Sequence, residues 1–284
     1  MKRVLFTGGT GFIGRNVLPI LKKSFEITAP GRSDLDLLNS DEVYRYFSRN
    51  PFDVVVHCAN PNSVKNAAED SADTMFENSL RMFMNFYAAR GLFGKLIYTG
   101  SGAEYDKTMD IISVSEENCF RSLPKDNYGL AKYIMNSIAD KSENIFNLCV
   151  FGCYGPYDYH TKFMTHCIDC CMKKQPITIR QECRVDYIHI YDLADMMRWM
   201  IDNDMRYHMY NASGGTPHLL SEIANEVRRQ MCSEVSIMIL SEGMNLEYTS
   251  DGSRFWNESG ITPQISIEAG IANQIEWQMK RISK

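Results

Sequence analysis

Three side chains of this sequence, Ser101, Tyr128 and Lys132, have the types and spacing needed for acid-base chemistry. Tyr128 and Lys132 lie four residues apart in a stretch that predicts the start of a helix, so phenol and ammonium share one helical face. A tyrosine has an ordinary pKa of about 10, and a neighbouring ammonium would lower it toward the working range. The hydroxyl of Ser101 could hold a carbonyl group opposite the phenol. The alternative for Tyr128 is packing in the core.

Glycines near the N-terminus predict what accompanies this chemistry. Residues 4–7 are apolar or β-branched and predict a short buried strand, after which Gly8, Gly11 and Gly14 lead into an apolar-periodic helix. Gly8 permits a sharp turn, Gly11 lets the backbone approach a phosphate, and Gly14 lets the helix pack on the strand. The pattern predicts a dinucleotide whose pyrophosphate lies at the helix N-terminus, and a cationic nicotinamide would lower the pKa of the tyrosine further. The alternative is a glycine-rich turn without a ligand.

The loop after the second predicted strand indicates which dinucleotide is bound. In NAD-binding folds an acidic residue at the end of this strand binds the ribose hydroxyls. Here the strand over residues 25–28 ends without one, and Arg32 and Ser33 follow. A guanidinium and a hydroxyl suit a 2′-phosphate, so NADP(H) is favoured over NAD(H). The alternative is that Arg32 is a loop residue in solvent.

The order of the predicted elements is that of an α/β protein with a doubly wound parallel sheet. Asn39 and Glu42 are spaced as in a capping box at the start of the second helix. We expect His57 to be a packed residue at a strand end rather than a catalyst. After the first strand and helix, the pattern predicts strands over 25–28, 53–57 and 95–99 and helices over 40–49 and 72–90.

The helix over 72–90 carries aromatic and methionine side chains on more than one face. An apolar surface of this kind exceeds what one core contact needs, which predicts that part of the helix is a subunit interface. We therefore expect a homodimer.

The composition restricts the partners. The chain has 284 residues, of which 44% are hydrophobic and 23% charged, as in ordinary globular proteins. A net charge of −5 without a basic block argues against a nucleic-acid partner. The start runs directly into a strand and no apolar run approaches membrane-spanning length, so neither a signal peptide nor a membrane is predicted. Nine cysteines in unpatterned spacing fit a reducing compartment, which predicts a cytoplasmic protein.

A cluster of cysteines and histidines could be imagined as a metal site, formed by Cys167, Cys170, Cys171, His160 and His166. Cys170 and Cys171 cannot share a helical face, however, and no second CxxC completes four ligands. We expect these cysteines to be small apolar residues of a helix, and we predict no metal.

Taken together, these segments give the chain a family resemblance that runs nearly from end to end. The sequence resembles the extended short-chain dehydrogenases/reductases, the NAD(P)-dependent epimerase/dehydratase family that acts on nucleotide sugars. The cofactor turn Thr7–Gly14, the serine motif Gly100–Tyr105 and the catalytic helix Tyr128–Lys132 carry the resemblance. Phe151–Pro156 resembles the turn into the substrate lobe, and Arg184–His189 resembles a segment whose arginine grips a sugar-nucleotide pyrophosphate.

The resemblance implies roles for particular residues. Arg184 would contact the substrate phosphates through its guanidinium, and the alternative is an ion pair with Asp186 or Asp192. The catalytic residues would be Ser101, Tyr128 and Lys132. The cofactor would be bound by Gly8, Gly11, Phe12, Ile13, Gly14, Arg32, Asp36, Leu37, Ala59, Asn78, Tyr128 and Lys132. The nucleoside-diphosphate sugar would be bound by Ser101, Lys162 and Arg184.

One branch of the family is the most similar. The segments Arg32–Leu37 and Pro51–Ala59 resemble the NADPH-dependent reductases of 4-keto-6-deoxysugars. Some of those enzymes also epimerise, with a cysteine two residues after the catalytic serine. Here that position is Ala103, which cannot move a proton, so we expect reduction without epimerisation. The chain departs from the family at Tyr191, where an aspartate is frequent, and in residues 241–250, which lack an arginine-x-glycine-aspartate segment.

We expect two interleaved lobes. A dinucleotide-binding lobe would comprise residues 1–156, with residues of about 186–212 returning to it. A smaller C-terminal lobe for the nucleotide sugar would comprise residues 157–185 and 213–284. Its basic side chains predict either a diphosphate site or a solvated face, and they are Lys162, Lys173, Lys174, Arg180 and Arg184.

Two other functions compete with keto reduction. A redox-neutral epimerase that retains NAD is disfavoured by Arg32 and by the missing acidic residue after the second strand. A cofactor-binding sensor or scaffold without turnover is disfavoured by the intact set of serine, tyrosine and lysine.

Overall fold

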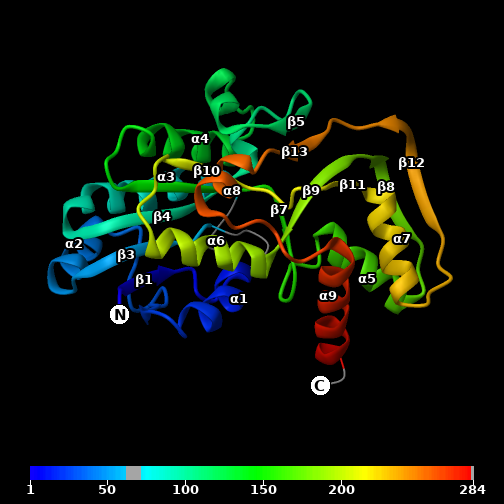
Figure 1. Ribbon diagram of the computed structural model, residues 1–284, viewed down its shortest axis with the longest axis horizontal. Coiled ribbons are helices and arrows are strands. Elements are labelled where there is room, and N and C mark those ends of the chain that lie inside the picture. The colour runs from blue at the N-terminus through cyan, green and yellow to red at the C-terminus, as the bar shows by residue number, and fades with distance from the viewer. Residues whose placement is uncertain (62–71, 283–284) are drawn as a thin grey trace.

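The computed structural model describes residues 1–61 and 72–282. Six parallel strands form the central sheet of the first domain: β1 (Arg3–Thr7), β2 (Glu26–Thr28), β3 (Phe52–His57), β4 (Phe93–Ser101), β6 (Ile145–Val150) and β10 (Met209–Ala212). Their order is β10-β6-β4-β3-β1-β2, so the direction of winding reverses between β1 and β3 (Figure 1). This sheet confirms the predicted doubly wound Rossmann fold.

Helices cover both faces of the sheet (Figure 1). Because successive strand residues point to opposite faces, Val4 and Phe6 of β1 face one layer of helices and Leu5 faces the other. The first layer contains α1 (Phe12–Leu21) and α6 (Ile190–Asp202), and the second contains α2 (Ser40–Arg49), α3 (Ala72–Ala88) and α4 (Asn127–Ala139). Each face thus has its own hydrophobic core.

Local sequence signals account for the start of α2. The side chain of Asn39 accepts a hydrogen bond from the backbone N–H of Glu42 at 3.1 Å, as an N-cap residue does. The carboxylate of Glu42 does not complete a capping box and instead accepts from the backbone of Asp36 at 2.9 Å. On α3, Phe83 and Phe86 are fully buried against the sheet, while Met84 is 42% exposed. A homodimer through α3 stays a prediction.

The second lobe has two sheets and three helices. Four strands follow the order β11-β9-β13-β5 and a fifth, β7, pairs with β9; they are β5 (Ile111–Val114), β7 (Gly152–Tyr154), β9 (Arg184–His189), β11 (Pro217–Leu219) and β13 (Tyr248–Ser250). β8 (Ile177–Glu182) pairs with β12 (Ile237–Met244). The helices are α5 (Phe163–Lys173), α7 (Leu220–Gln230) and α9 (Ile267–Ile282). Cys167, Cys170 and Cys171 of α5 are buried in the hydrophobic core of this lobe.

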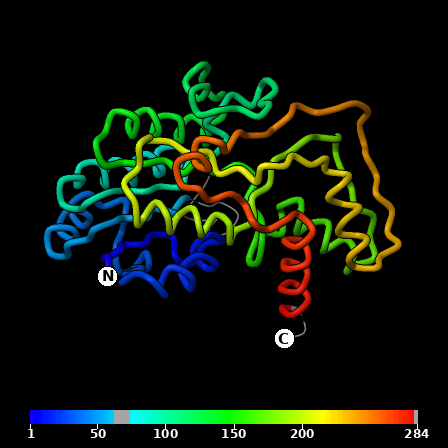
Figure 2. The backbone as a smooth tube through the Cα atoms, in the orientation of Figure 1, coloured from blue at the N-terminus to red at the C-terminus, as the bar shows by residue number. Residues whose placement is uncertain are grey.

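The two lobes exchange segments in a different way from the predicted division. We expected residues of about 186–212 to return to the first domain, but β9 belongs to the second sheet, so the return consists of α6 and β10. β5, from within residues 1–156, also lies in the second sheet. After β12 the chain runs from the outer end of the second lobe back to the first domain, where α8 (Ser253–Ser259) packs beside β10 (Figure 2). No helix in the described parts of the chain is long and apolar enough to cross a membrane.

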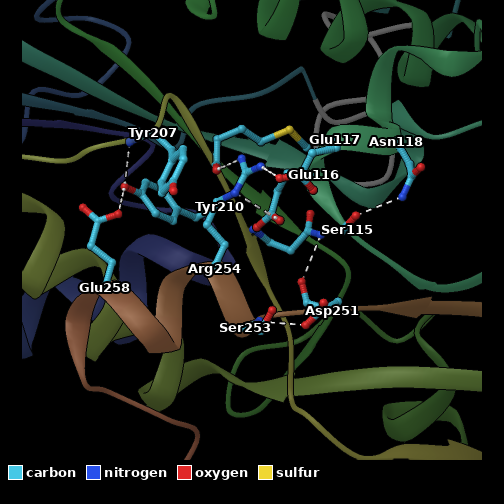
Figure 3. A network of polar contacts seen from close by, with 12 residues as sticks. Ser115, Glu116, Glu117, Asn118, Tyr207, Tyr210, Asp251, Ser253, Arg254 and Glu258 are labelled. Carbon is cyan, nitrogen blue, oxygen red and sulfur yellow. Dashed lines mark hydrogen bonds and ion pairs between the residues drawn. The ribbon is translucent and has the colours of Figure 1, made fainter.

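Arg254 of α8 attaches this returning segment to the first domain. Its guanidinium points toward Glu116 and Glu117 of the 3-10 helix η3 (Glu116–Arg121), as Figure 3 shows. Nε of Arg254 lies 3.4 Å from Oε2 of Glu116, whose side chain is 3% exposed. The carboxylate of Glu116 also accepts a hydrogen bond from the backbone of Asn211 at 2.8 Å. The ion pair is therefore largely buried.

Replacing Arg254 by methionine is expected to destabilise the protein by about 3 kcal/mol, because it leaves the Glu116 carboxylate buried without its cation. Urea unfolding would measure the free energy of unfolding. The control is Arg198→Met, which removes an ion pair with Asp195 whose side chains are 48% and 42% exposed, and is expected to cost less than about 0.5 kcal/mol. Equal effects of the two substitutions would contradict the prediction.

Candidate active site

A cavity of about 1490 Å³ lies where the first sheet meets the second lobe. The carboxyl ends of β1, β3 and β4 contribute to its lining, as do β9 and β13. It sits at the point where the winding of the sheet reverses, which is where doubly wound sheets bind ligands. Its lining includes most of the predicted site residues: Gly8, Gly11, Phe12, Ile13, Arg32, Asp36, Leu37, Ala59, Asn78, Ser101, Tyr128, Lys132 and Lys162.

The glycine turn has the geometry that a pyrophosphate requires. Gly8 has a φ of +80°, and a Cβ there would lie 2.6 Å from the backbone nitrogen of Ala59. A Cβ at Gly14 would lie 2.4 Å from the carbonyl oxygen of Gly8, so glycine alone allows α1 to pack on the turn. Gly11 is the N-cap of α1 and supplies no side-chain cap, which leaves the first N–H groups of the helix for an anion. The turn therefore fits a dinucleotide cofactor.

The loop after β2 presents a guanidinium to the cavity. β2 ends at Thr28 without an acidic residue, and Arg32 is an exposed residue that lines the cavity. The carboxylates of the same loop are engaged by the backbone: Asp34 accepts from Gly31 at 2.9 Å, and Asp36 accepts from Leu38 at 3.0 Å. A guanidinium lining the cavity at this place can contact a 2′-phosphate.

Helix α4 positions Tyr128 and Lys132. The side chain of Asp126 caps the helix by accepting from the backbone N–H of Gly129 at 2.9 Å. Tyr128 lies in the first turn at the cavity, and Lys132 follows one turn later, with its ammonium 6.0 Å from the centre of the Tyr128 ring. Lys132 is 3% exposed, and its Nζ donates a hydrogen bond to the carbonyl oxygen of Thr99 at 2.8 Å. The ammonium is therefore fixed between the helix and the end of β4.

Ser101, the last residue of β4, lines the same cavity as the Tyr128 phenol. Its hydroxyl oxygen accepts a hydrogen bond from the backbone N–H of Ala103 at 3.2 Å. The Ser101 hydroxyl, as a hydrogen-bond partner, lowers the pKa of Tyr128, but burial outweighs this effect and raises that pKa to about 12. We predict that the neighbouring ammonium and a cationic nicotinamide lower this pKa; the protein's own groups raise it, because desolvation disfavours the phenolate. Tyr128 thus holds its proton and is suited to donate it.

Glu104 is a buried carboxylate of this site that the sequence reasoning missed. It closes the short 3-10 helix η2 (Gly102–Glu104), is fully buried, and accepts from the backbone of Ser101 at 2.9 Å and from the side chain of Asn147 at 2.8 Å. Burial raises the pKa of Glu104 to about 8, while the positive charge of Lys132 lowers it. Burial likewise lowers the pKa of Lys132 to about 8, against the attraction of Glu104. Glu104 and Lys132 are thus two buried groups whose charges affect each other's pKa.

The side of the cavity near α5 carries a second buried carboxyl group. Lys162, at the N-cap of α5, lines the cavity together with Asp158. Burial raises the pKa of Asp158 to about 7, although Lys162 and the backbone N–H of Tyr159 favour its charged form. A carboxyl group that titrates near neutral pH and faces a cavity is suited to contact a hydroxyl-rich ligand.

The structure does not place Arg184 with the other predicted site residues. Val185, Asp186 and Tyr187 of β9 line the cavity, whereas Arg184, the first residue of the strand, lines a separate groove. Nε of Arg184 lies 3.9 Å from a carboxylate oxygen of Glu247. Asp186, one alternative ion-pair partner, is buried and instead accepts from the hydroxyls of Ser213 and Ser250. Substrate binding by Arg184 stays a prediction.

Two further predictions can be followed in the structure. His57 is buried, and its Nδ1 lies 2.8 Å from the hydroxyl oxygen of Thr7, while its ring packs against Phe86. Burial lowers the pKa of His57 to about 3, so the ring is neutral at ordinary pH. Tyr191 packs against His189 with ring centres 4.9 Å apart and contacts the first core. Both residues have packing contacts that account for their positions.

Tyr248 is the other site residue that was missed. Its side chain lines the cavity from β13, and its hydroxyl neighbours Ser101 and Tyr128. The sequence offered one usable signal for Glu104, a charged residue between Ala103 and Tyr105 in the serine motif. It offered none for Tyr248, because the residue lies far along the chain and only the fold of residues 248–250 brings it to the serine.

The comparisons with known proteins agree with this geometry. The model of the NAD dependent epimerase/dehydratase family matches residues 4–213. The sequence is 21% identical to the GDP-L-colitose synthase of Yersinia pseudotuberculosis, over 97% of each chain. A GDP-L-fucose synthetase from Naegleria fowleri superposes with a TM-score of 0.85 at 16% identity, over 100% of this chain and 94% of that one. MlghC, a GDP-mannoheptose C4 reductase from Campylobacter jejuni solved with NADP bound, gives 0.81 at 18% identity over 98% of each chain.

At such low sequence identities, the likeness to solved structures shows the fold alone. The match to the family model also shows the family to which the chain belongs. The matched residues span most of the chain and contain the glycine turn, Ser101, Tyr128 and Lys132. This protein therefore belongs to the NAD-dependent epimerase/dehydratase family.

Proposed function

We propose that this protein is an NADPH-dependent reductase of a 4-keto-6-deoxysugar carried on a nucleoside diphosphate. The observation that carries the proposal is that one cavity holds the glycine turn, Ser101, Tyr128 and Lys132, at the winding reversal of the sheet. This arrangement has a cofactor cradle on one side and a protonated phenol with a serine hydroxyl on the other. Reduction of a carbonyl group needs both parts.

The residues of the chain divide the reaction between them. NADPH, when bound, would supply the hydride for the carbonyl carbon. Tyr128 donates its proton to the carbonyl oxygen, and Ser101 holds that oxygen by a hydrogen bond. The ammonium of Lys132 stabilises the phenolate that Tyr128 leaves behind, and the carbonyl oxygen of Thr99 fixes the ammonium in place.

The substrate class rests on the lining of the second lobe and on the relatives. Lys162 and the N-terminus of α5 offer positive charge to a diphosphate, and Asp158 faces the same space. The relatives named above are a GDP-L-colitose synthase, a GDP-L-fucose synthetase and a GDP-mannoheptose C4 reductase. Ala103 lines the cavity two residues after Ser101 and has no proton to exchange, which favours reduction without epimerisation.

NADP(H) is the proposed cofactor for two reasons. Arg32 lines the cavity behind a strand that ends without an acidic residue, and the Campylobacter relative was solved with NADP bound. An epimerase of the same family would instead retain NAD through many turnovers. The two functions therefore differ in whether NADPH is oxidised as the sugar is converted.

The deciding experiment follows NADPH and NADH consumption with a GDP-linked and with a dTDP-linked 4-keto-6-deoxyhexose. We expect NADPH to be oxidised in proportion to the sugar alcohol formed. Arg32→Ala is expected to raise the KM for NADPH about 10-fold and to leave that for NADH unchanged, since only NADPH has the 2′-phosphate. Protein isolated with stoichiometric NAD, or conversion of the sugar without NADPH consumption, would show an epimerase instead.

A further inference from the structure

Tyr248 occupies a fixed position beside the catalytic serine. Its ring packs against Phe151 with centres 4.9 Å apart, and β13 pairs in parallel with both β5 and β9 at this residue. A Cβ at Gly102 would lie 2.2 Å from the Tyr248 hydroxyl oxygen. The hydroxyl is therefore in contact with the residue that directly follows Ser101. It comes from residues 241–250, the part of the chain where the family's arginine-containing segment is absent.

The segment that carries Tyr248 is anchored on both sides. The hydroxyl of Thr249 accepts from the backbone of Ser113 at 2.7 Å, and the hydroxyl of Ser250 donates to the buried carboxylate of Asp186 at 2.6 Å. Directly after it, Asp251 donates from its backbone to Val114 at 3.0 Å, and the network around Arg254 holds α8 (Figure 3). These contacts leave the Tyr248 side chain little freedom to leave the serine.

The hydrogen-bonding capacity of Ser101 limits what its hydroxyl can do. A serine hydroxyl accepts two hydrogen bonds and donates one. The backbone N–H of Ala103 takes one acceptor position at 3.2 Å. The hydroxyls of Tyr128 and Tyr248 also lie near Ser101, since both tyrosines line the cavity with it and the Tyr248 hydroxyl contacts Gly102. If Tyr248 donates into the second acceptor position, the serine proton has one direction left, toward Tyr128 and the oxygen that both residues hold.

We propose that Tyr248 is a positioning residue that donates a hydrogen bond to Ser101 and thereby directs the serine proton to the reacting carbonyl oxygen. The inference rests on the proposed function, which supplies that carbonyl. Through it, the substrate lobe contributes to the reaction centre of the first domain. Burial raises the pKa of Tyr248, which favours the protonated phenol that this donation requires.

The test is a double-mutant cycle of Tyr248→Phe and Ser101→Ala, assayed by NADPH consumption with GDP-linked and dTDP-linked 4-keto-6-deoxyhexoses. Phenylalanine keeps the ring on Phe151 and removes only the hydroxyl. We expect Tyr248→Phe to lower kcat about fivefold and to change the KM for the sugar nucleotide less than about twofold. In the Ser101→Ala background it should cause no further loss, because Tyr248 acts through the serine.

The matched control is Tyr154→Phe, a buried tyrosine of the second lobe's core that does not line the cavity, and its kcat should equal that of the wild type. The inference is overturned if Tyr248→Phe retains full kcat, or if the same loss persists in the Ser101→Ala background. A wild-type protein that consumes no NADPH with either probe overturns the proposed function itself. Should Tyr248→Phe fail to fold, Tyr248→Met keeps the apolar bulk and serves the same cycle.

Discussion

Tyr128→Phe is expected to lower kcat about 10³-fold while the KM for NADPH changes less than about threefold. Under the proposed function the Tyr128 phenol protonates the carbonyl oxygen, since Ser101 is a weaker acid and Lys132 donates to Thr99. Phenylalanine leaves the glycine turn and the position of Lys132 unchanged. Steady-state kinetics with varied NADPH and sugar nucleotide would separate the two constants.

The control for this substitution lies on the same helix. Tyr133→Phe removes a hydroxyl from α4 at a position that packs on Phe120 and does not line the cavity. It should leave both kcat and the KM for NADPH at wild-type values. A Tyr128→Phe protein that turns over at the wild-type rate would remove the catalytic role of the phenol and favour a function without proton transfer by this residue.

The local part of the active site could be predicted from the sequence. The glycine turn is determined by steric requirements of its own backbone, so Gly8 and Gly14 could be assigned before any partner residue was known. Tyr128 and Lys132 share a helical face because of their spacing, and Ser101 ends a strand. Each of these assignments depends on residues that are near one another in the chain.

What could not be predicted depends on contacts between distant segments and on burial. Arg184 was placed by similarity to a motif, but at the start of β9 its side chain lines another groove beside α7 and α9. The pKa of Tyr128 depends on how completely the surrounding protein buries it, which spacing does not reveal. Tyr248 reaches the serine only because β13 lies between β5 and β9. The sequence therefore identifies the reactive residues well. It is a poorer guide to the burial and the neighbours of those residues.

Glu104 illustrates how a buried neighbour affects the charge of a catalytic residue. Glu104→Gln is expected to move the alkaline limit of activity to lower pH. The Glu104 carboxylate raises the pKa of Lys132, which burial has already lowered to about 8. Without the carboxylate, the pKa of Lys132 falls further and the lysine loses its charge at a lower pH. We expect kcat to fall about 30-fold at about pH 9 and to stay near the wild-type value at about pH 6. Profiles of kcat against pH would measure both.

The substitution itself should be tolerated. A glutamine side chain in place of Glu104 would keep an acceptor for the backbone of Ser101. Asn147, whose side-chain oxygen has no hydrogen-bond partner among the described residues, could flip to accept from the new amide.

The free energy of unfolding, measured against pH, tests the pKa of Glu104 independently of activity. The pKa of Glu104 is raised in the folded state to about 8, so the folded protein binds a proton there more tightly than the unfolded chain does. This contribution is fully present below about pH 4.5 and is lost as the pH rises through about 8. The wild type should therefore lose stability relative to Glu104→Gln between these values in urea unfolding.

The control for the activity profile is Glu116→Gln, at a buried carboxylate outside the cavity, which should leave the alkaline limit of kcat unchanged. Identical pH profiles for wild type and Glu104→Gln would show that the carboxyl group stays protonated throughout and does not act on Lys132.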